Sequence, residues 1–139
     1  MAQAAKPNCQ FKDAKVLVAE DDEFSLEVLK YMLSVYGITA DQAVDGVETI
    51  ERVKQKDYDL LILDIHMPHK DGNQAVREIR EMEIKQPVIV ALTASVFKAE
   101  RETSIAAGFD DCFNKPLDIS GIEKIIKKYL KSKQISVEL

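Results

Sequence analysis

The chain has 139 residues, with 19 Lys and Arg against 24 Asp and Glu, so its formal net charge is −5. This length fits one globular domain whose core needs no disulfide or metal, and it leaves no room for a second full domain. The mild acidity excludes a general electrostatic attraction to nucleic acid, so no direct nucleic-acid partner is expected. A group of lysines near the C-terminal end predicts a solvated helix face, and it comprises Lys124, Lys127, Lys128, Lys131 and Lys133.

The cysteines and the chain ends indicate the cellular location of the protein. Cys9 and Cys112 lie far apart and fit no metal-ligand spacing, which favours reduced thiols and a cytoplasmic location. No signal peptide and no apolar run long enough to span a bilayer is found, so no membrane partner is expected. Residues 1–12 and 132–139 lack a strong period and predict flexible ends around a domain at 13–131.

Five short apolar segments of strand length follow one another along the chain. They are rich in Val, Ile and Leu. The predicted strands are Val16–Ala19, Ile38–Ala43, Leu60–Leu63, Val88–Leu92 and the weaker Asp111–Phe113.

Segments with helical periodicity separate and follow these strands. The clearest repeat apolar residues at Phe24, Val28, Leu29, Met32, Leu33 and Tyr36, and at Ile119, Ile122, Ile125, Ile126 and Tyr129. Helix ends are predicted at Gly37 and Gly108, and helix starts at Asp45, Asp71 and Asp118. Strands that are apolar on both faces predict a parallel sheet between two helix layers. The expected fold is therefore α/β, a doubly wound sheet of five parallel strands with five helices.

Polar residues follow four of the five predicted strands. The first strand is followed by Glu20, Asp21, Asp22 and Glu23, and the later ones by Asp64, by Thr93, and by Lys115 with Pro116. A parallel sheet brings these strand ends to one edge. Carboxylates gathered there raise one another's pKa unless a cation neutralises them, and oxygen ligands without Cys or His favour Mg²⁺ over zinc.

The same edge predicts phosphoryl chemistry. Asp64 extends directly from a buried strand, and a carboxylate held beside a metal can accept a phosphoryl group as an acyl phosphate. Negative charge on the oxygens of the transferred group would be neutralised by the metal, Lys115 and the Thr93 hydroxyl. No general base is required, because an ionised carboxylate is already the nucleophile.

In this order, the residues resemble the receiver domain of two-component response regulators over about residues 13 to 130. The matching pieces are "VLVAEDDE" at 16–23, "AVDGVETI" at 43–50, "LLILDIHMPHKDG" at 60–72, "ALTA" at 91–94 and "NKPL" at 114–117. The resemblance implies a flavodoxin-like sheet with strand order 2-1-3-4-5, counted along the five predicted strands. Receivers of hybrid histidine kinases and stand-alone receivers both remain open as the source of the chain.

The resemblance also implies a role for each site residue. Asp64 would be the phosphoacceptor, and the Mg²⁺ ligands would be Glu20, Asp21, Asp64 and the backbone carbonyl of His66. Alignment from the strand end favours Glu20 and Asp21 over Asp22. Thr93 would be the switch hydroxyl and Lys115 the lysine that pairs with the phosphoryl group, and the Lys115–Pro116 bond resembles one that is cis in the family.

One position departs from the family pattern. An aromatic residue usually stands three positions before the lysine, and it turns inward when the switch hydroxyl moves, but Cys112 stands there in this chain. Phe113 should face the opposite side of the sheet, because successive strand side chains alternate. Cys112 is therefore the switch position without its ring, and we expect a buried, inert thiol.

The implied function is a phosphorylation switch, not a classical enzyme. The expected phosphodonor is a histidine kinase or a histidine phosphotransfer protein, and the face formed by the fourth helix, fifth strand and fifth helix would report to its target. That target is a downstream protein, a missing output domain or a second copy of the chain. Two alternatives stay open, namely a Mg²⁺-dependent phosphohydrolase with Asp64 as nucleophile and a receiver-like binding module that is never phosphorylated.

Overall fold

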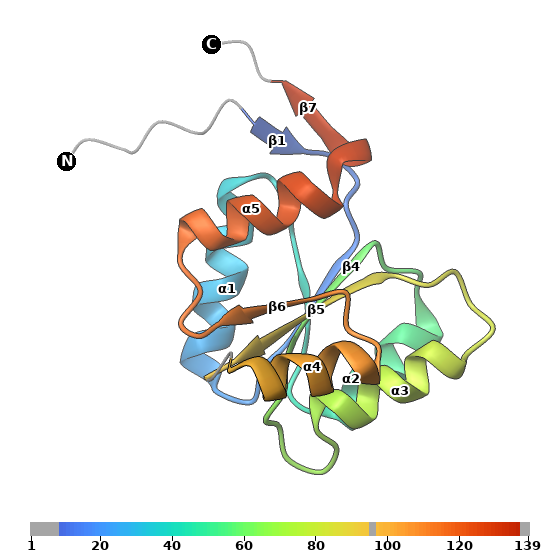
Figure 1. The fold of residues 1–139 in the computed structure, drawn as a ribbon. Helices are drawn as coiled ribbons and strands as arrows, with labels where there is room; N and C mark the ends of the chain where they lie inside the picture. Colours follow the sequence, from blue (N-terminus) through green and yellow to red (C-terminus); the bar gives the residue numbers. More distant parts are fainter. Residues whose placement is uncertain (1–8, 95–96, 137–139) are drawn as a thin grey trace.

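The computed structural model describes residues 9–94 and 97–136 and contains one central parallel sheet (Figure 1). Five strands lie in the order β3-β2-β4-β5-β6. They are β2 (Val16–Ala19), β3 (Asp41–Ala43), β4 (Leu60–Asp64), β5 (Val88–Thr93) and β6 (Asp111–Asn114). This is the predicted order, with the five predicted strands as β2 to β6. The register pairs Leu63 with both Ala19 and Ala91, so the carboxyl ends of the central strands lie at one edge.

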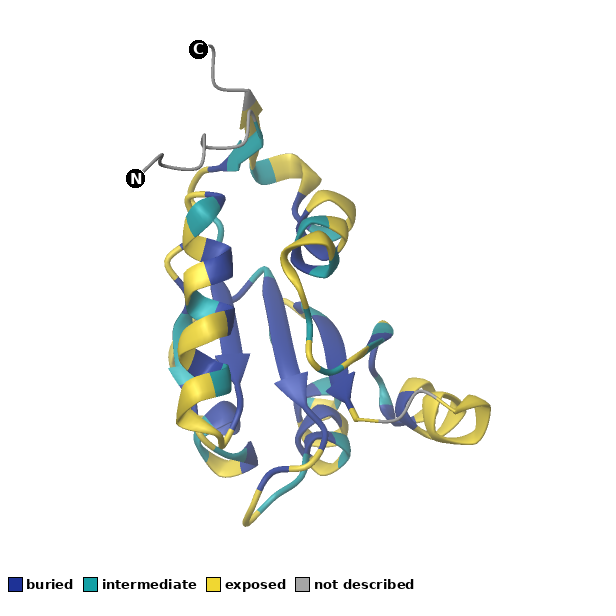
Figure 2. Cartoon of the chain, turned by 90° about the vertical axis from the view of Figure 1, so that its left-hand side faces the viewer, coloured by how far each residue is buried: buried dark blue, intermediate teal, exposed yellow. Residues whose placement is uncertain are grey.

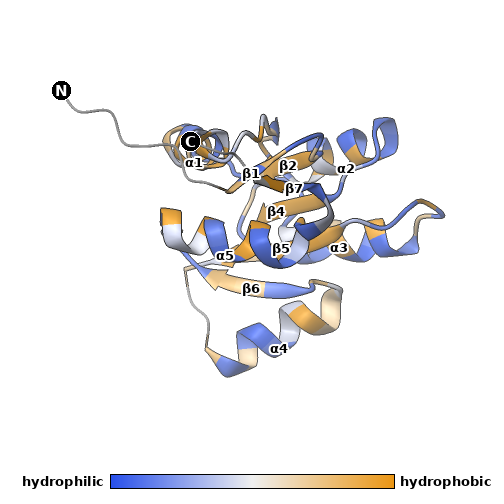
Figure 3. Cartoon of the chain, turned by 90° about the horizontal axis from the view of Figure 1, so that it is seen from above, coloured by the Kyte–Doolittle hydropathy of each residue, from blue (hydrophilic) through white to orange (hydrophobic). Residues whose placement is uncertain are grey.

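Five helices connect and cover these strands. They are α1 (Glu23–Val35), α2 (Gly46–Gln55), α3 (Gly72–Glu81), α4 (Lys98–Ala107) and α5 (Ile119–Tyr129). Seen from above, α1 and α5 lie on one side of the sheet and α2 and α3 on the other, while α4 lies beyond β6 (Figure 3). Asp45, Asp71 and Asp118 cap their helices as predicted, because each side chain accepts a hydrogen bond from a first-turn amide.

The sheet divides the hydrophobic core into two halves. Alternating side chains of β2 show the division, because Val16 and Val18 pack with α1 and α5 whereas Leu17 and Ala19 pack with α2 and α3. The central strands β2, β4 and β5 are almost wholly buried, whereas the edge strands β3 and β6 are only partly buried and the outer faces of the helices are exposed (Figure 2). A sheet buried on both faces explains why its strands read as continuous apolar runs.

One predicted strand is shorter in the structure than in the sequence pattern. Only Asp41–Ala43 of the predicted segment Ile38–Ala43 pairs with β2. The amide of Ile38 instead donates to the Leu33 carbonyl oxygen at 3.1 Å, which closes the end of α1. The preceding residues therefore belong to the helix terminus, although their apolar pattern is typical of a strand.

A small antiparallel ribbon joins the two flanks of the domain. Strand β1 (Cys9–Phe11) pairs with β7 (Gln134–Ser136), which follows the short 3-10 helix η1 (Lys131–Lys133). Both segments fall within the ends that the sequence predicted to be flexible. Phe11 is 2% exposed, and its amide donates to the Tyr36 carbonyl oxygen at 2.9 Å. The ribbon lies beyond the ends of α1 and α5, away from the carboxyl ends of the strands (Figure 1).

Within the described residues, every helix is too short or too polar to cross a bilayer.

Candidate functional site

Three carboxylates meet at the carboxyl ends of β2 and β4. Glu20, Asp21 and Asp64 each offer an oxygen, and these atoms lie within 4.8 Å of one another. Glu20 and Asp64 are buried, whereas Asp21 is exposed. A set of three carboxylate oxygens fits a hard divalent cation such as Mg²⁺. Asp22 does not belong to this set, because its carboxylate caps α1 by accepting from the Ser25 amide at 2.9 Å.

Lys115 binds two of these carboxylates from the end of β6. Its Nζ lies 2.8 Å from Glu20 Oε2 and 2.9 Å from Asp64 Oδ2. Burial opposes the charge of the ammonium group, but the hydrogen bonds that it donates to both carboxylates outweigh this effect and raise the pKa of Lys115. Burial also raises the pKa of Glu20, partly offset by Lys115. Lys115 therefore stays a cation and offsets part of the local negative charge.

Backbone amides fix the orientation of both buried carboxylates. The Asp22 amide donates to Glu20 Oε1 at 3.2 Å, and the His66 amide donates to Asp64 Oδ1 at 3.1 Å. The His66 side chain itself is exposed. The loop after β4 turns tightly back, because Gly72 donates to the Ile65 carbonyl oxygen at 2.8 Å and a Cβ at residue 72 would lie 2.7 Å from the Asp64 carbonyl oxygen. A side chain at that position would push Asp64 out of place.

Thr93 ends the strand next to Asp64. It is 5% exposed, and its carbonyl oxygen accepts a hydrogen bond from the Lys115 amide at 2.8 Å. This hydrogen bond links the ends of β5 and β6, so Thr93 and Lys115 are held next to each other at the same edge of the sheet. The Lys115–Pro116 peptide bond is cis, as the sequence resemblance implied.

The switch position holds a buried thiol. Cys112 is 4% exposed and packs in the core half beneath α2, α3 and α4, while Phe113 packs in the opposite half. The predicted alternation of these two side chains is confirmed. Burial raises the pKa of Cys112, so the thiol is protonated at neutral pH and is a poor nucleophile.

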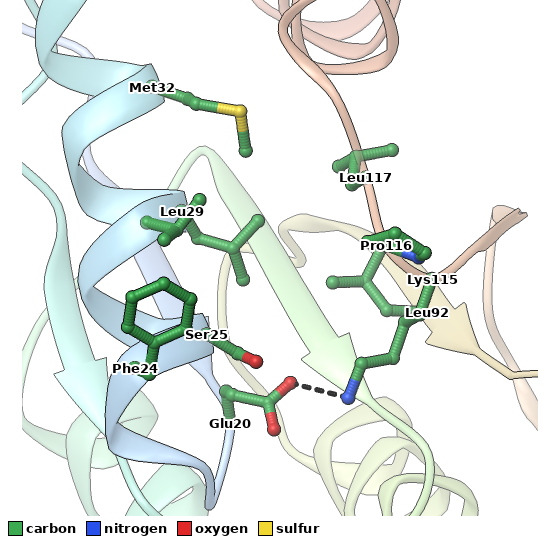
Figure 4. Close-up of a pocket in the computed structure, with 10 residues that line it drawn as sticks. Glu20, Phe24, Ser25, Leu29, Met32, Leu92, Lys115, Pro116 and Leu117 are labelled. Atoms are coloured by element: carbon green, nitrogen blue, oxygen red, sulfur yellow. Dashed lines mark hydrogen bonds and ion pairs between the residues drawn. The ribbon is translucent and has the colours of Figure 1, made fainter.

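A groove of about 330 Å³ lies beside the carboxylates, and sequence reasoning missed it (Figure 4). Its walls come from α1 and from the segment after β6, namely Glu20, Phe24, Ser25, Val28, Leu29, Met32, Leu92, Lys115, Pro116 and Leu117. Phe24 is 77% exposed and Val28 is 38% exposed, although both belong to the apolar repeat of this helix. The apolar positions of this helix therefore cover more of its surface than the part that is buried in the core. These extra apolar residues were the only signal of the groove in the sequence.

Comparison with known proteins agrees with the fold. The family model of the response regulator receiver domain matches residues 16–127. Hybrid signal transduction histidine kinase L of Dictyostelium discoideum is 38% identical over 125 residues, which cover 85% of this chain and 7% of that protein. Sensor protein EvgS of Escherichia coli K12 is 36% identical over 118 residues, which cover 85% of this chain and 10% of that protein.

Solved structures give the same result. The receiver domain of sensor histidine kinase PA1611 from Pseudomonas aeruginosa PAO1, crystallised with a magnesium ion in its active site cleft, has a TM-score of 0.79 and 28% identity. The match covers 85% of this chain and 98% of that one. The co-crystal of the Saccharomyces cerevisiae phosphotransfer protein Ypd1 with the Ssk1 receiver domain matches with a TM-score of 0.79 and 25% identity, over 86% of this chain and 90% of that one.

The chain therefore belongs to the receiver domain family of two-component signalling. The first curated relatives that it matches are two hybrid signal transduction histidine kinases and a sensor protein, and it spans a tenth or less of their length.

Proposed function

We propose that this receiver is a phosphorylation switch in which Asp64 accepts a phosphoryl group from a phosphohistidine. The observation that carries the proposal is the contact of Lys115 Nζ with both Glu20 and Asp64, beside the three carboxylates that can hold a cation. This arrangement supplies a nucleophile and positive charge at one strand edge, which is what phosphoryl transfer requires.

In the proposed step, an Asp64 carboxylate oxygen forms a bond to phosphorus while the bond from phosphorus to the donor imidazole nitrogen breaks. The electron pair stays on that nitrogen. Lys115 exchanges its contact with Asp64 for a phosphoryl oxygen, and the Thr93 hydroxyl donates to another. The His66 amide keeps the acceptor carboxylate in place through its 3.1 Å hydrogen bond. The active site thus works by positioning and charge neutralisation.

Magnesium fits this site, because all side-chain donors are carboxylate oxygens. Glu20, Asp21 and Asp64 would hold the ion together with the His66 carbonyl, and a bound Mg²⁺ would neutralise charge on the phosphoryl oxygens. The buried position of Glu20, already bonded to Lys115, suits an indirect contact through water.

We further propose that the donor docks on the groove of Figure 4. The groove is apolar along α1 and ends at Glu20 and Lys115, so a helix laid into it would bring its own side chain to the carboxylates. A phosphodonor whose histidine lies on an exposed helix would fit the groove, and the side chain of Phe24, which is 77% exposed, would be buried against that helix.

The central experiment is phosphorylation by acetyl phosphate with Mg²⁺, followed by intact mass measurement. One added phosphoryl group is expected on the unaltered chain and none on Asp64→Asn. Omitting Mg²⁺ or introducing Asp21→Asn should also prevent labelling. Release of phosphate without a retained group would support a phosphohydrolase, and no labelling at any donor concentration would support a passive binding module.

Docking is tested by comparing two donors. Phe24→Ala should slow transfer from a phosphorylated histidine phosphotransfer protein and leave labelling by acetyl phosphate unchanged. Tyr31→Ala is the matched control, because Tyr31 is an aromatic residue of α1 that is 69% exposed and does not line the groove. Equal effects of the two variants would contradict docking at the groove.

A further inference from the structure

The loop between β4 and α3, residues 65–71, is held at both of its ends. At its start, the His66 amide donates to Asp64 Oδ1 at 3.1 Å. At its far end, the Gly46 amide of α2 donates to the Lys70 carbonyl oxygen at 3.0 Å. A Cβ at residue 46 would lie only 2.2 Å from that oxygen, so the start of α2 and the loop touch backbone to backbone. The His66 carbonyl, an expected Mg²⁺ ligand, therefore lies between two anchors.

A side-chain contact lies beside the second anchor. His69 Nδ1 is 2.8 Å from Asp45 Oδ2. Hydrogen bonds from the Glu48 amide and from His69 lower the pKa of Asp45, so its carboxylate is ionised and only accepts. Nδ1 is therefore the donor, whether or not the imidazole ring is charged.

His69 also has an unusual backbone conformation. Its φ of 67° lies in the left-handed region, which residues other than glycine adopt only in a few per cent of cases. Such a conformation persists where the surrounding structure holds it. The side-chain contact with Asp45 and the backbone contact of Lys70 with Gly46 are the interactions that hold the loop here.

Asp45 is a fixed acceptor because α2 holds it. Its Oδ1 accepts from the Glu48 amide at 2.8 Å, and its carbonyl oxygen accepts from the Thr49 amide at 3.1 Å and the Thr49 hydroxyl at 2.7 Å. The Asp45 side chain is 13% exposed, whereas that of His69 is 72% exposed. One carboxylate oxygen of Asp45 thus serves the helix, and the other serves the loop.

We propose that His69 is a positioning residue whose hydrogen bond to Asp45 holds the loop that carries the His66 carbonyl and thereby strengthens Mg²⁺ binding. The inference rests on the proposed function, because it concerns the Mg²⁺ site of that function. His69 itself touches neither the ion nor the phosphoryl group. A loop that keeps the binding conformation for only part of the time binds the ion more weakly in the same proportion.

The test is calorimetric titration of the full, unphosphorylated chain with Mg²⁺. His69→Ala should raise the dissociation constant about two- to fivefold, the range for one partly exposed polar contact. His69→Asn should restore the original value, because the amide nitrogen of Asn can donate in place of Nδ1 and Asn tolerates a positive φ. His69→Gly adopts the same φ freely but has no donor, so it should bind Mg²⁺ at least as weakly as His69→Ala.

The partner side of the contact gives a matched test. Asp45→Ser keeps a cap on α2, but its single hydroxyl oxygen leaves no second acceptor for His69. It should weaken Mg²⁺ binding as much as His69→Ala does, and the double variant should lose no more than either one. Lys54→Ala, which removes another exposed basic residue near α2's other end, should change nothing.

Labelling by acetyl phosphate supplies a second measurement. His69→Ala should need more Mg²⁺ for half-maximal labelling but reach the original rate when Mg²⁺ is saturating. The inference is overturned by an unchanged Mg²⁺ affinity of His69→Ala, by full affinity of His69→Gly, by a lack of rescue with Asn, or by additive losses in the double variant. An unaltered chain that binds no Mg²⁺ would overturn it as well. A chain that binds Mg²⁺ but takes no label contradicts the proposed function alone, because the titration still measures the effect of His69.

Discussion

The helices α1 and α4 flank the same edge of the sheet, but they differ in how many apolar side chains they bury and in how their first turns are capped. Helix α1 buries Leu26, Leu29, Met32 and Leu33, and the Asp22 side chain caps its first turn. Helix α4 buries only Ser104 and Ala107, and its N-cap residue, Phe97, makes no capping hydrogen bond. Helices with few buried apolar contacts open at low free-energy cost. The site therefore lies between a firmly anchored helix, α1, which lines the groove, and a weakly anchored helix, α4.

Polar contacts replace apolar packing as the anchor of α4. The Arg101 guanidinium donates to the Cys112 carbonyl oxygen at 3.2 Å and to Asp111 Oδ1 at 3.0 Å. The Tyr129 hydroxyl donates to the other carboxylate oxygen of Asp111 at 2.9 Å. Asp111 thus joins α4 to α5 across the end of β6, next to the switch position that lacks an aromatic ring. Such contacts can be exchanged when α4 shifts, without opening the core.

The largest expected loss of stability comes from removing a buried side chain of α1. Leu33 is fully buried, so Leu33→Ala should lower the free energy of unfolding by about 2–5 kcal/mol. Ile105→Ala in α4 should cost less than about 1 kcal/mol, because Ile105 is 42% exposed. Urea denaturation of both variants measures the contrast, and equal losses would show that the two helices are anchored alike.

An intermediate effect is expected at the polar anchor. Asp111→Asn should cost about 1–2 kcal/mol at neutral pH, because hydrogen bonds to a charged group are lost or weakened. Burial of Asp111 opposes its charge, but bonds from the Cys112 amide and Tyr129, with Lys128 and Arg101 nearby, lower its pKa below the usual value. Amide hydrogen exchange should show faster opening of α4 than of α1 in this variant.

The sign of the pH dependence follows from that lowered pKa. A carboxylate with a lowered folded-state pKa stabilises the fold fully above its ordinary pKa of about 4, and the contribution is lost as the pH falls through the folded-state value. The stability difference between the unaltered chain and Asp111→Asn should therefore shrink below about pH 4. A difference that grows in acid would contradict the anchor.

The smallest expected effect comes from giving α4 a side-chain cap like the one that α1 has. Phe97→Ser places a capping hydroxyl before Glu100, which completes the spacing of a capping box at the start of α4. The helix should gain about 0.5–1 kcal/mol, and Phe97 loses little because it is 75% exposed. Hydrogen exchange of the α4 amides should slow, while exchange in α1 stays unchanged. Faster exchange would mean that Phe97 stabilises the helix through contacts of its own.

Much of the strand edge was predictable from local patterns. Apolar runs located the strands at Val16–Ala19 and Leu60–Leu63, one residue short of the observed end of β4. The rule that parallel strands end together placed Glu20, Asp21, Asp64 and Lys115 at one site. Caps at Asp45, Asp71 and Asp118 were predictable for the same reason, since they depend on neighbours within one turn. These features need only short-range chemistry and one topological rule.

The tertiary structure decided what depends on contacts between distant segments. Cys9–Phe11 and Gln134–Ser136 have no strong pattern of their own and become strands only because they pair. The groove exists because the segment after β6 lies opposite Phe24. The sequence by itself determined the sheet, the caps and the residues at the strand ends, because hydrophobic period and turn chemistry are local. Only the packed chain decided which walls surround those residues, because burial and cavity shape are properties of all the elements together.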